Sequence, residues 1–115
     1  MNMKTSLSSK IAVGAFLATC LLGWSAHAGD ASQLWATKCA SCHGKDGKGG
    51  TTMGRKLSIK DLTDPKVQAS FTDADATKAI KEGITDNGTV KMKGFGDKLS
   101  DDDIKALVAQ VRSLK

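Results

Sequence analysis

The sequence is poor in aromatic side chains and in the residues that bind zinc. Its 115 residues include no tyrosine, two tryptophans, three phenylalanines, two histidines and three cysteines. One residue of each of the last four types lies within the first 28 positions. Without that stretch, a zinc site built from cysteine and histidine is one ligand short of the usual four. The remaining large side chains can fill only a marginal core for a domain of this size.

The sequence also lacks a hydrophobic run long enough to span a membrane. Residues 11–24 are nearly all apolar, whereas a spanning helix needs roughly twenty such residues. The run follows a polar segment containing Lys4 and Lys10 and precedes Ala-His-Ala at 26–28, which is the order of a secretory signal peptide. The alternatives are an uncleaved anchor, for which the run is short, and a lipoprotein attached at Cys20, for which residues 17–20 form a poor lipobox. We expect residues 1–28 to be removed and residues 29–115 to form one periplasmic domain.

The charge of this domain is too small and too dispersed for a nucleic-acid partner. Residues 29–115 contain fifteen basic and twelve acidic residues, a formal net charge of +3. The lysines form no clustered stripe and are not interleaved with aromatic residues, as binding to single strands would require. We therefore expect no nucleic acid among the partners.

Residues 39–43 read C-A-S-C-H, the pattern for covalent attachment of a c-type haem. Thiols at Cys39 and Cys42 lie on one helical turn and can reach the two vinyl groups of one porphyrin. His43 then lies beneath the ring, where an imidazole nitrogen can ligate iron. A thioredoxin-type redox pair would need a strand before Cys39, and a disulfide within one helical turn is awkward. One haem c is the predicted cofactor, and its apolar volume would complete the marginal core.

The remaining pattern predicts helices and loops, and hence an all-α domain. The helix N-termini are predicted at Asp30, at Asp64-Pro65, at the capping box beginning with Thr72, and at Ser100. The first helix is expected to end at Gly44 and to use Trp35 as a core aromatic. The last helix has an apolar stripe from Ile104 to Leu114 that should pack on the first.

Three segments between these helices are predicted to be irregular. The glycine-rich residues 44–50 are expected to form a flexible loop, because Gly50 stands where a phosphate-binding loop requires lysine. Residues 51–70 read as loop apart from the short helix after Asp64-Pro65. Residues 86–88 are a turn, and residues 91–96 show neither helical nor strand periodicity.

A six-coordinate iron needs a second protein ligand, and residues 29–115 contain no second histidine. Methionine is the remaining choice, at Met53 or Met92. Met53 lies ten residues past His43 and could equally fill a gap in the core. Met92 lies between glycines shortly before the last helix, where a loop could bring its thioether to the iron. Placement alone favours Met92.

The chain resembles small, soluble bacterial class I c-type cytochromes over residues 29–115. The shared features are Trp35 four residues before the first cysteine, the C-x-x-C-H pattern, the segment 91–100 and the helical ending at 104–114. The resemblance implies a cytochrome c fold with three to four short helices around one covalently attached haem, and with crossing N- and C-terminal helices. It also implies attachment at Cys39 and Cys42 and axial ligation by His43 and Met92.

The expected function is soluble, periplasmic electron transfer by Fe(III)/Fe(II) cycling, without catalysis. Redox proteins are the expected donor and acceptor, membranes are met only through membrane-bound redox complexes, and the chain is expected to be a monomer. The lysines at 45, 48, 91, 93 and 98 either surround the haem edge or form ordinary solvated surface.

The alternative to an electron carrier is a ligand-binding or peroxidase-like haem protein from which Met92 dissociates. It lacks an evident distal acid–base group, since Glu82 is the only glutamate.

Overall fold

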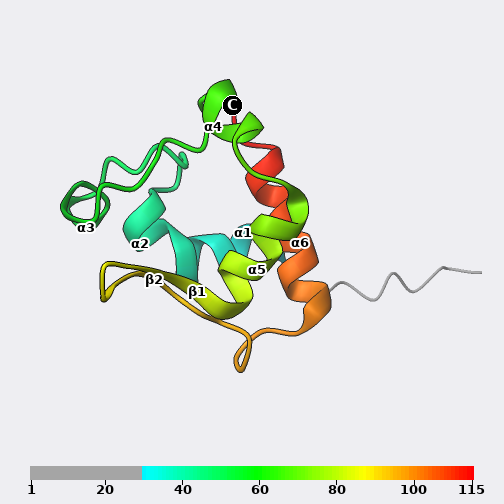
Figure 1. The fold of residues 1–115 in the computed structure, drawn as a ribbon. Coiled ribbons are helices and arrows are strands. Elements are labelled where there is room, and N and C mark those ends of the chain that lie inside the picture. The colour runs from blue at the N-terminus through cyan, green and yellow to red at the C-terminus, as the bar shows by residue number, and fades with distance from the viewer. Residues whose placement is uncertain (1–29) are drawn as a thin grey trace, which may run out of the picture.

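The computed structural model describes residues 30–115, so the signal peptide predicted at 1–28 lies outside the described residues. The helices are α1 (Ala31–Leu34), η1 (Trp35–Cys39, one turn of π-helix), α2 (Ala40–His43), α3 (Thr52–Lys56), α4 (Pro65–Ala69), α5 (Asp73–Glu82) and α6 (Asp101–Arg112). The strands are β1 (Gly83–Asp86) and β2 (Thr89–Lys93). The first three segments are consecutive, and α6 contacts both α1 and α5 (Figure 1).

The predicted helix N-termini are confirmed by the hydrogen bonds at their caps. The Asp30 carboxylate accepts from the Ser32 amide, and the Asp64 carboxylate accepts from the Lys66 amide. Helices α5 and α6 both begin with complete capping boxes, in which a hydroxyl and a carboxylate three residues apart satisfy each other's backbone amides. These contacts are local, which explains why sequence alone could locate them.

The core forms where the C-terminal helix packs on the first helical stretch. The predicted stripe is confirmed as far as Val111, because Ile104, Leu107, Val108 and Val111 are all buried. Leu114 lies beyond the end of α6 and is only partly buried. The four buried residues share one cluster with Trp35, whose side chain is 4% exposed, while Leu34 packs against its margin. Helix α6 contacts both α1 and α5. The predicted contact between the first and last helices therefore closes the domain.

The hairpin formed by β1 and β2 was not predicted. The strands are antiparallel and pair Gly83 with Lys93, Ile84 with Met92, and Thr85 with Val90. Lys91 has no partner in this register, so a bulge interrupts β2. A bulge breaks the alternation of exposed and buried side chains that identifies a strand, which is why residues 91–96 did not read as one. The predicted turn at 86–88 is confirmed between the strands, with Asn87 and Gly88 at positive φ.

A short helix, α3, also lies within residues 51–70, where a loop was predicted up to Asp64. Thr51 caps this helix by accepting a hydrogen bond from the Gly54 amide. Gly54 packs so closely on the end of α2 that a Cβ there would lie 2.5 Å from the carbonyl oxygen of Cys42. Five residues give no helical period to read, so only the cap could have indicated the helix.

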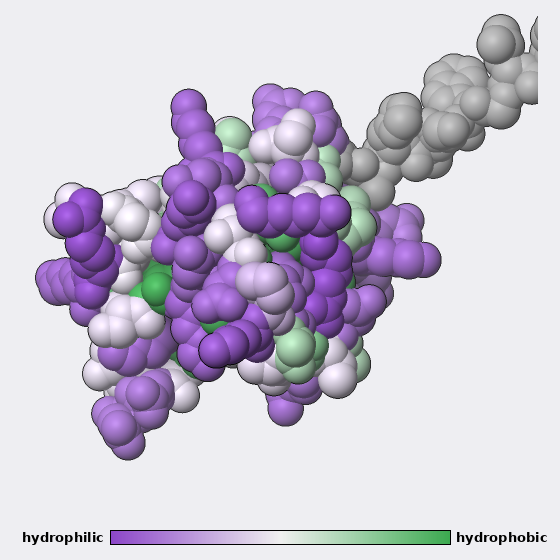
Figure 2. All heavy atoms as spheres, turned by 90° about the horizontal axis from the view of Figure 1, so that it is seen from above, coloured by the Kyte–Doolittle hydropathy of each residue, from purple (hydrophilic) through white to green (hydrophobic). Residues whose placement is uncertain are grey.

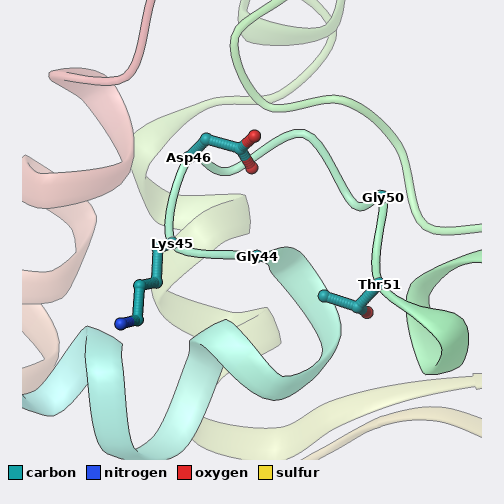
Figure 3. A pocket seen from close by; sticks show the side chains of 5 residues that line it. All are labelled: Gly44, Lys45, Asp46, Gly50 and Thr51. Carbon is teal, nitrogen blue, oxygen red and sulfur yellow. The ribbon is translucent and has the colours of Figure 1, made fainter.

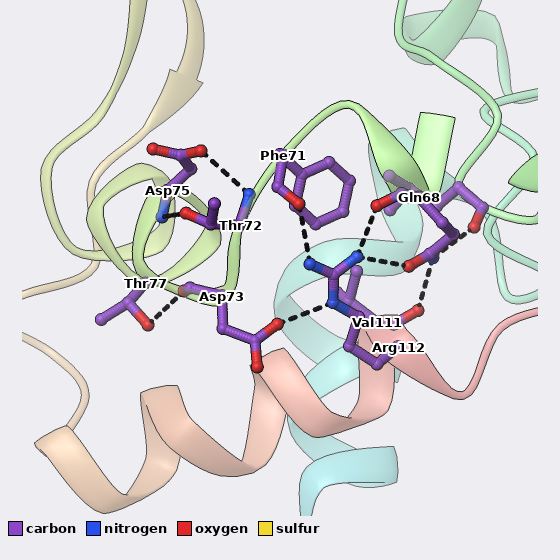
Figure 4. A network of polar contacts seen from close by, with 9 residues as sticks. Gln68, Phe71, Thr72, Asp73, Asp75, Thr77, Val111 and Arg112 are labelled. Atoms are coloured by element: carbon purple, nitrogen blue, oxygen red, sulfur yellow. Dashed lines mark hydrogen bonds and ion pairs between the residues drawn. The ribbon is translucent and has the colours of Figure 1, made fainter. Parts of the chain in front are cut away.

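Arg112 ties the end of α6 to α4 and to the start of α5 (Figure 4). Its guanidinium donates to Asp73 at 2.7 Å, to the backbone and side-chain oxygens of Gln68, and to the Phe71 carbonyl at 2.8 Å. It also lies over the Phe71 ring, 4.4 Å from the centroid. The Gln68 amide completes the network by donating to Val111 and Leu62. A planar guanidinium carries five N–H donors, so Arg112 can donate to all four of these acceptors at once.

The outer surface is mainly hydrophilic. Figure 2 shows one face on which charged and polar residues cover most of the area and hydrophobic atoms are visible mainly in recesses between them. Three large hydrophobic residues are nevertheless exposed, namely Met53, Ile84 and Val90. Among residues 30–115, no helix has the length and apolar character that crossing a membrane requires.

Candidate functional site

The three residues of the attachment pattern lie at the end of the first helical stretch. Cys39 ends η1, and Cys42 and His43 lie in the single turn α2. Both cysteines are free thiols and partly buried. Burial raises the pKa of Cys39 to about 11, against the opposing effect of the Lys38 charge. Cys39 is therefore a neutral thiol at ordinary pH.

The imidazole of His43 is partly buried and neutral. Burial lowers its pKa because the charged form is desolvated. Its ring lies 5.5 Å from the Trp35 ring, measured between centroids. The Nδ1 atom is buried, and the described part of the chain offers it no hydrogen-bond partner. A neutral ring with an unused nitrogen is the form of histidine that ligates metals.

The loop after α2 fixes the backbone of this site. Gly44 ends the helix at φ 81°, as predicted, and its carbonyl oxygen accepts a 3.1 Å hydrogen bond from the Trp35 indole. The Gly49 amide donates to the His43 carbonyl at 2.7 Å, and the Thr51 hydroxyl donates to the Cys42 carbonyl at 2.7 Å. The carbonyls of both residues at the end of α2 are thus held by the returning loop. No role was predicted for Gly49 or Thr51, although threonine is a common N-cap residue.

A hollow of about 340 Å³ opens inside this loop and is lined by Gly44, Lys45, Asp46, Gly50 and Thr51 (Figure 3). Figure 3 shows the Lys45 side chain pointing away from Asp46. The Asp46 carboxylate instead accepts from the Lys48 amide, which closes a local turn. A second hollow of about 660 Å³ lies beside Arg112 and the chain end. Neither hollow is lined by any of the four residues predicted to hold the haem, which are Cys39, Cys42, His43 and Met92.

Met92 lies on β2 rather than in a loop, which corrects the prediction. It is partly buried, pairs with Ile84 and packs against the same core cluster as Cys39. Met53, the other candidate, is 44% exposed. The expectation that Met53 fills a gap in the core is therefore wrong, because the turn of α3 leaves its side chain at the surface. Met92 remains the predicted distal ligand.

The donor set fits the haem c that the sequence predicts. It consists of two free thiols, a neutral imidazole with an unpartnered buried nitrogen, and a thioether, and both Cys39 and Met92 pack against the same core cluster. Residues 30–115 contain no group of three histidine, cysteine or acidic side chains placed to hold a metal ion by themselves. An imidazole and a thioether are donors that haem iron takes in c-type cytochromes.

Comparison with known proteins identifies related chains. Residues 26–110 match the family model described as cytochrome c oxidase, cbb3-type, subunit III. The structure is similar to that of the KustC0563 c-type cytochrome, with 34% sequence identity, a TM-score of 0.66 and coverage of 75% of this chain and 98% of that chain. It also resembles the c-type cytochrome NirC, at 23% identity, a TM-score of 0.54 and coverage of 70% and 82%, a likeness that shows the fold alone. No curated protein matches the chain.

These comparisons confirm the predicted cytochrome c fold and imply haem c and haem-based electron transfer. They leave the ligand residues, the processing of the N-terminus and the redox partners as predictions. The family model spans well over half of the sequence, and the first of the two structures is matched over nearly its whole length. The chain therefore belongs to the c-type cytochrome family whose model is described as cytochrome c oxidase, cbb3-type, subunit III.

Proposed function

We propose that this chain is a periplasmic, single-haem electron carrier that moves one electron at a time between redox proteins. The observation that carries the proposal is the pair of free, partly buried thiols at Cys39 and Cys42 beside an imidazole whose buried Nδ1 has no partner. Membership in a c-type cytochrome family supports it. Residues 1–28 act in this proposal as an export signal that is removed after Ala28.

Each site residue has a separate task in this proposal. A bound haem supplies a one-electron Fe(III)/Fe(II) couple. Cys39 and Cys42 would hold it covalently, and His43 and Met92 would ligate its iron. A thioether favours the ferrous state, so Met92 raises the reduction potential. Trp35, buried against the core and bonded to Gly44, fixes the helix that carries the two cysteines and the histidine.

Surface lysines are proposed to guide acidic redox partners to the site. Lys45 and Lys48 are exposed on the loop that follows α2, and Lys93 and Lys98 are exposed after Met92. Lys91 is partly buried, and the Lys93 ammonium lies 5.3 Å from the centroid of the Phe95 ring. Lys45 and Lys48 are thus the exposed lysines nearest in sequence to the attachment pattern. Such charges raise association rates at low salt. We propose that the protein acts as a monomer and meets membranes only through membrane-bound redox complexes.

The ligand-binding or peroxidase-like alternative finds no supporting group among the described residues. It needs a distal acid–base side chain. Glu82, the only glutamate in the sequence, is exposed at the last position of α5. The electron carrier therefore remains the better account of the site.

Intact mass and visible spectra of protein purified from the periplasm test the proposal. We expect one haem that survives denaturation and acid–acetone extraction, on a chain that begins at Gly29. Oxidised and reduced spectra should be those of a low-spin, six-coordinate haem. A mass without haem, with free thiols on Cys39 and Cys42, would contradict the proposal.

A further inference from the structure

We propose that Gly83 and Gly94 form a backbone clasp at the base of the hairpin, and that this clasp positions Met92 for ligation. Gly83 is the first residue of β1, and Gly94 directly follows β2. The inference rests on the proposed function, because it assumes that Met92 is the distal ligand. It assigns a task to two residues that touch neither the porphyrin-binding thiols nor the imidazole.

The first half of the clasp is the close approach of Gly83 to the methionine strand. Gly83 ends α5 with φ 82°, a conformation that favours glycine. A Cβ at this position would lie 2.5 Å from the carbonyl oxygen of Met92 and 2.7 Å from the amide nitrogen of Gly94. Any larger residue at position 83 must therefore displace the backbone of Met92 itself.

The second half is the matching approach of Gly94 to the end of α5. A Cβ on Gly94 would lie 2.7 Å from the carbonyl carbon of Glu82 and 2.8 Å from the carbonyl oxygen of Lys81. The missing side chain of Gly83 therefore leaves room for the backbone at Met92 and Gly94, and that of Gly94 leaves room for the backbone at Lys81 and Glu82. Two segments that cross without side chains between them are placed by direct backbone contact.

Hydrogen bonds fasten the chain just beyond the clasp. The Phe95 amide donates to the Ile80 carbonyl at 2.8 Å, and the Gly96 amide donates to the Lys81 carbonyl at 3.0 Å. These carbonyls lie in the last turn of α5, where helical partners are missing. Phe95 is only 5% exposed and belongs to the core. Met92 thus lies three residues before the buried Phe95, and it pairs with Ile84 close to the base of the hairpin.

The bulge isolates Met92 from the hairpin tip. Below the bulge, Gly83 pairs with Lys93 and Ile84 with Met92. Above it, Thr85 pairs with Val90, so the unpaired residue Lys91 separates the two registers. A slip of one residue moves every side chain of a strand to the opposite face. The register of Met92 is therefore set from the base, and the tip can change without moving it.

The chain provides a matched control for this idea. Gly88 at the tip has φ 77°, close to that of Gly83, but no heavy atom lies within 4 Å of the Cβ that alanine would add. Gly83→Ala and Gly88→Ala therefore both place alanine at a positive φ, and only the first brings its Cβ against the backbone of Met92. Gly94 does not have a positive φ, so an effect of Gly94→Ala reports the close backbone contact rather than strain at that residue.

Imidazole titration of the ferric holoprotein provides the test. Imidazole binds the iron only when methionine has dissociated, so its apparent affinity reports the fraction of open sites. We expect Gly83→Ala and Gly94→Ala to raise that affinity at least about tenfold and to weaken the sulfur-to-iron charge-transfer band. Gly88→Ala should change the affinity by no more than about twofold. Unchanged affinity in Gly83→Ala, or an equal rise in Gly88→Ala, would overturn the clasp.

An insertion keeps the proposal testable if the alanine variants fail to fold. One extra glycine after Gly88 lengthens the exposed tip, where insertions are tolerated. The clasp predicts an imidazole affinity within about twofold of the wild type, whereas a rise of about tenfold means that the turn positions Met92 and the clasp is wrong. Wild-type protein without the charge-transfer band would instead contradict Met92 ligation in the proposed function. The two failures are thus distinguishable.

Discussion

The Thr51 hydroxyl donates a 2.7 Å hydrogen bond to the carbonyl oxygen of Cys42. The Thr51 hydroxyl oxygen in turn accepts a 2.9 Å hydrogen bond from the amide of Gly54, in the first turn of α3. One partly buried side chain therefore joins the end of the attachment helix to the next helix. Its removal leaves both a carbonyl and an amide without their partner.

Thr51→Val is expected to lower the free energy of unfolding by about 1–2 kcal/mol, because it removes a helix cap and a partly buried hydrogen bond. Thr51→Ser is the matched control, since it keeps the hydroxyl and should retain most of the stability. Denaturant unfolding of the holoproteins measures both. Equal losses in the two variants would assign the effect to the methyl group and contradict the hydrogen-bond account.

Arg112→Lys is expected to lower the free energy of unfolding by about 1–3 kcal/mol, because an ammonium cannot replace a fork that serves Asp73, Gln68 and Phe71 together. Asp73→Asn should cost only about 0–1 kcal/mol. Its side chain is 71% exposed, so water screens that ion pair. Denaturation with urea separates the two, and comparable losses would mean that the ion pair rather than the backbone contacts dominates.

Asp75→Asn should destabilise the protein at neutral pH and much less in acid. The backbone amide of Thr72, together with its side chain, lowers the pKa of Asp75 below the ordinary 3.8. The carboxylate therefore stabilises the fold at pH values above 3.8, and this contribution disappears as pH falls through the lowered pKa. Urea unfolding at several pH values should show the gap between wild type and variant closing in acid. Asp86→Asn, which removes an equal charge at the hairpin, serves as the control, and a gap independent of pH would refute the prediction.

The sequence predicted features that depend on neighbouring residues. The capping box at Thr72, the serine N-cap at Ser100 and the helix start at Asp64-Pro65 each lie within four residues, and all are confirmed. The burial of Trp35 and of the α6 stripe followed from helical periodicity and is confirmed as well. The placement of Cys39 and its neighbours at a helix end also required only local reasoning.

The missed features depend on contacts between distant segments or on broken periodicity. The bulge at Lys91 interrupts the alternation of side chains along β2, so the sequence did not indicate a strand and Met92 was predicted to lie in a loop. No role was predicted for Arg112, because its partners are about forty residues away in the sequence. The clasp between Gly83 and Gly94 is likewise invisible until the end of α5 and the end of β2 are placed side by side.

Neutralising the loop lysines should slow electron transfer with a negatively charged partner. The double change Lys45→Gln and Lys48→Gln is expected to lower the association rate constant about twofold to fivefold at low ionic strength. The difference should vanish at high salt, where charges are screened over a few ångströms. Lys78→Gln with Lys105→Gln removes the same charge from exposed positions on α5 and α6. Equal slowing by both pairs in stopped-flow measurements would mean that net charge, not a lysine docking surface, controls encounter.

Met92→Ala is expected to abolish the weak sulfur-to-iron charge-transfer band of the ferric protein and to lower its reduction potential. Water or a harder donor would take the vacant position and favour ferric over ferrous iron. The same change should open the iron to carbon monoxide or cyanide.

Met53→Ala is the control for this substitution. Because the Met53 side chain is 44% exposed, its removal should leave the band in place and change stability by no more than about 0.5 kcal/mol. Loss of the band in Met53→Ala but not in Met92→Ala would reverse the ligand assignment while leaving a methionine-ligated cytochrome. A wild-type protein without the band has no methionine on its iron, and the ligand-binding alternative would then replace the electron carrier.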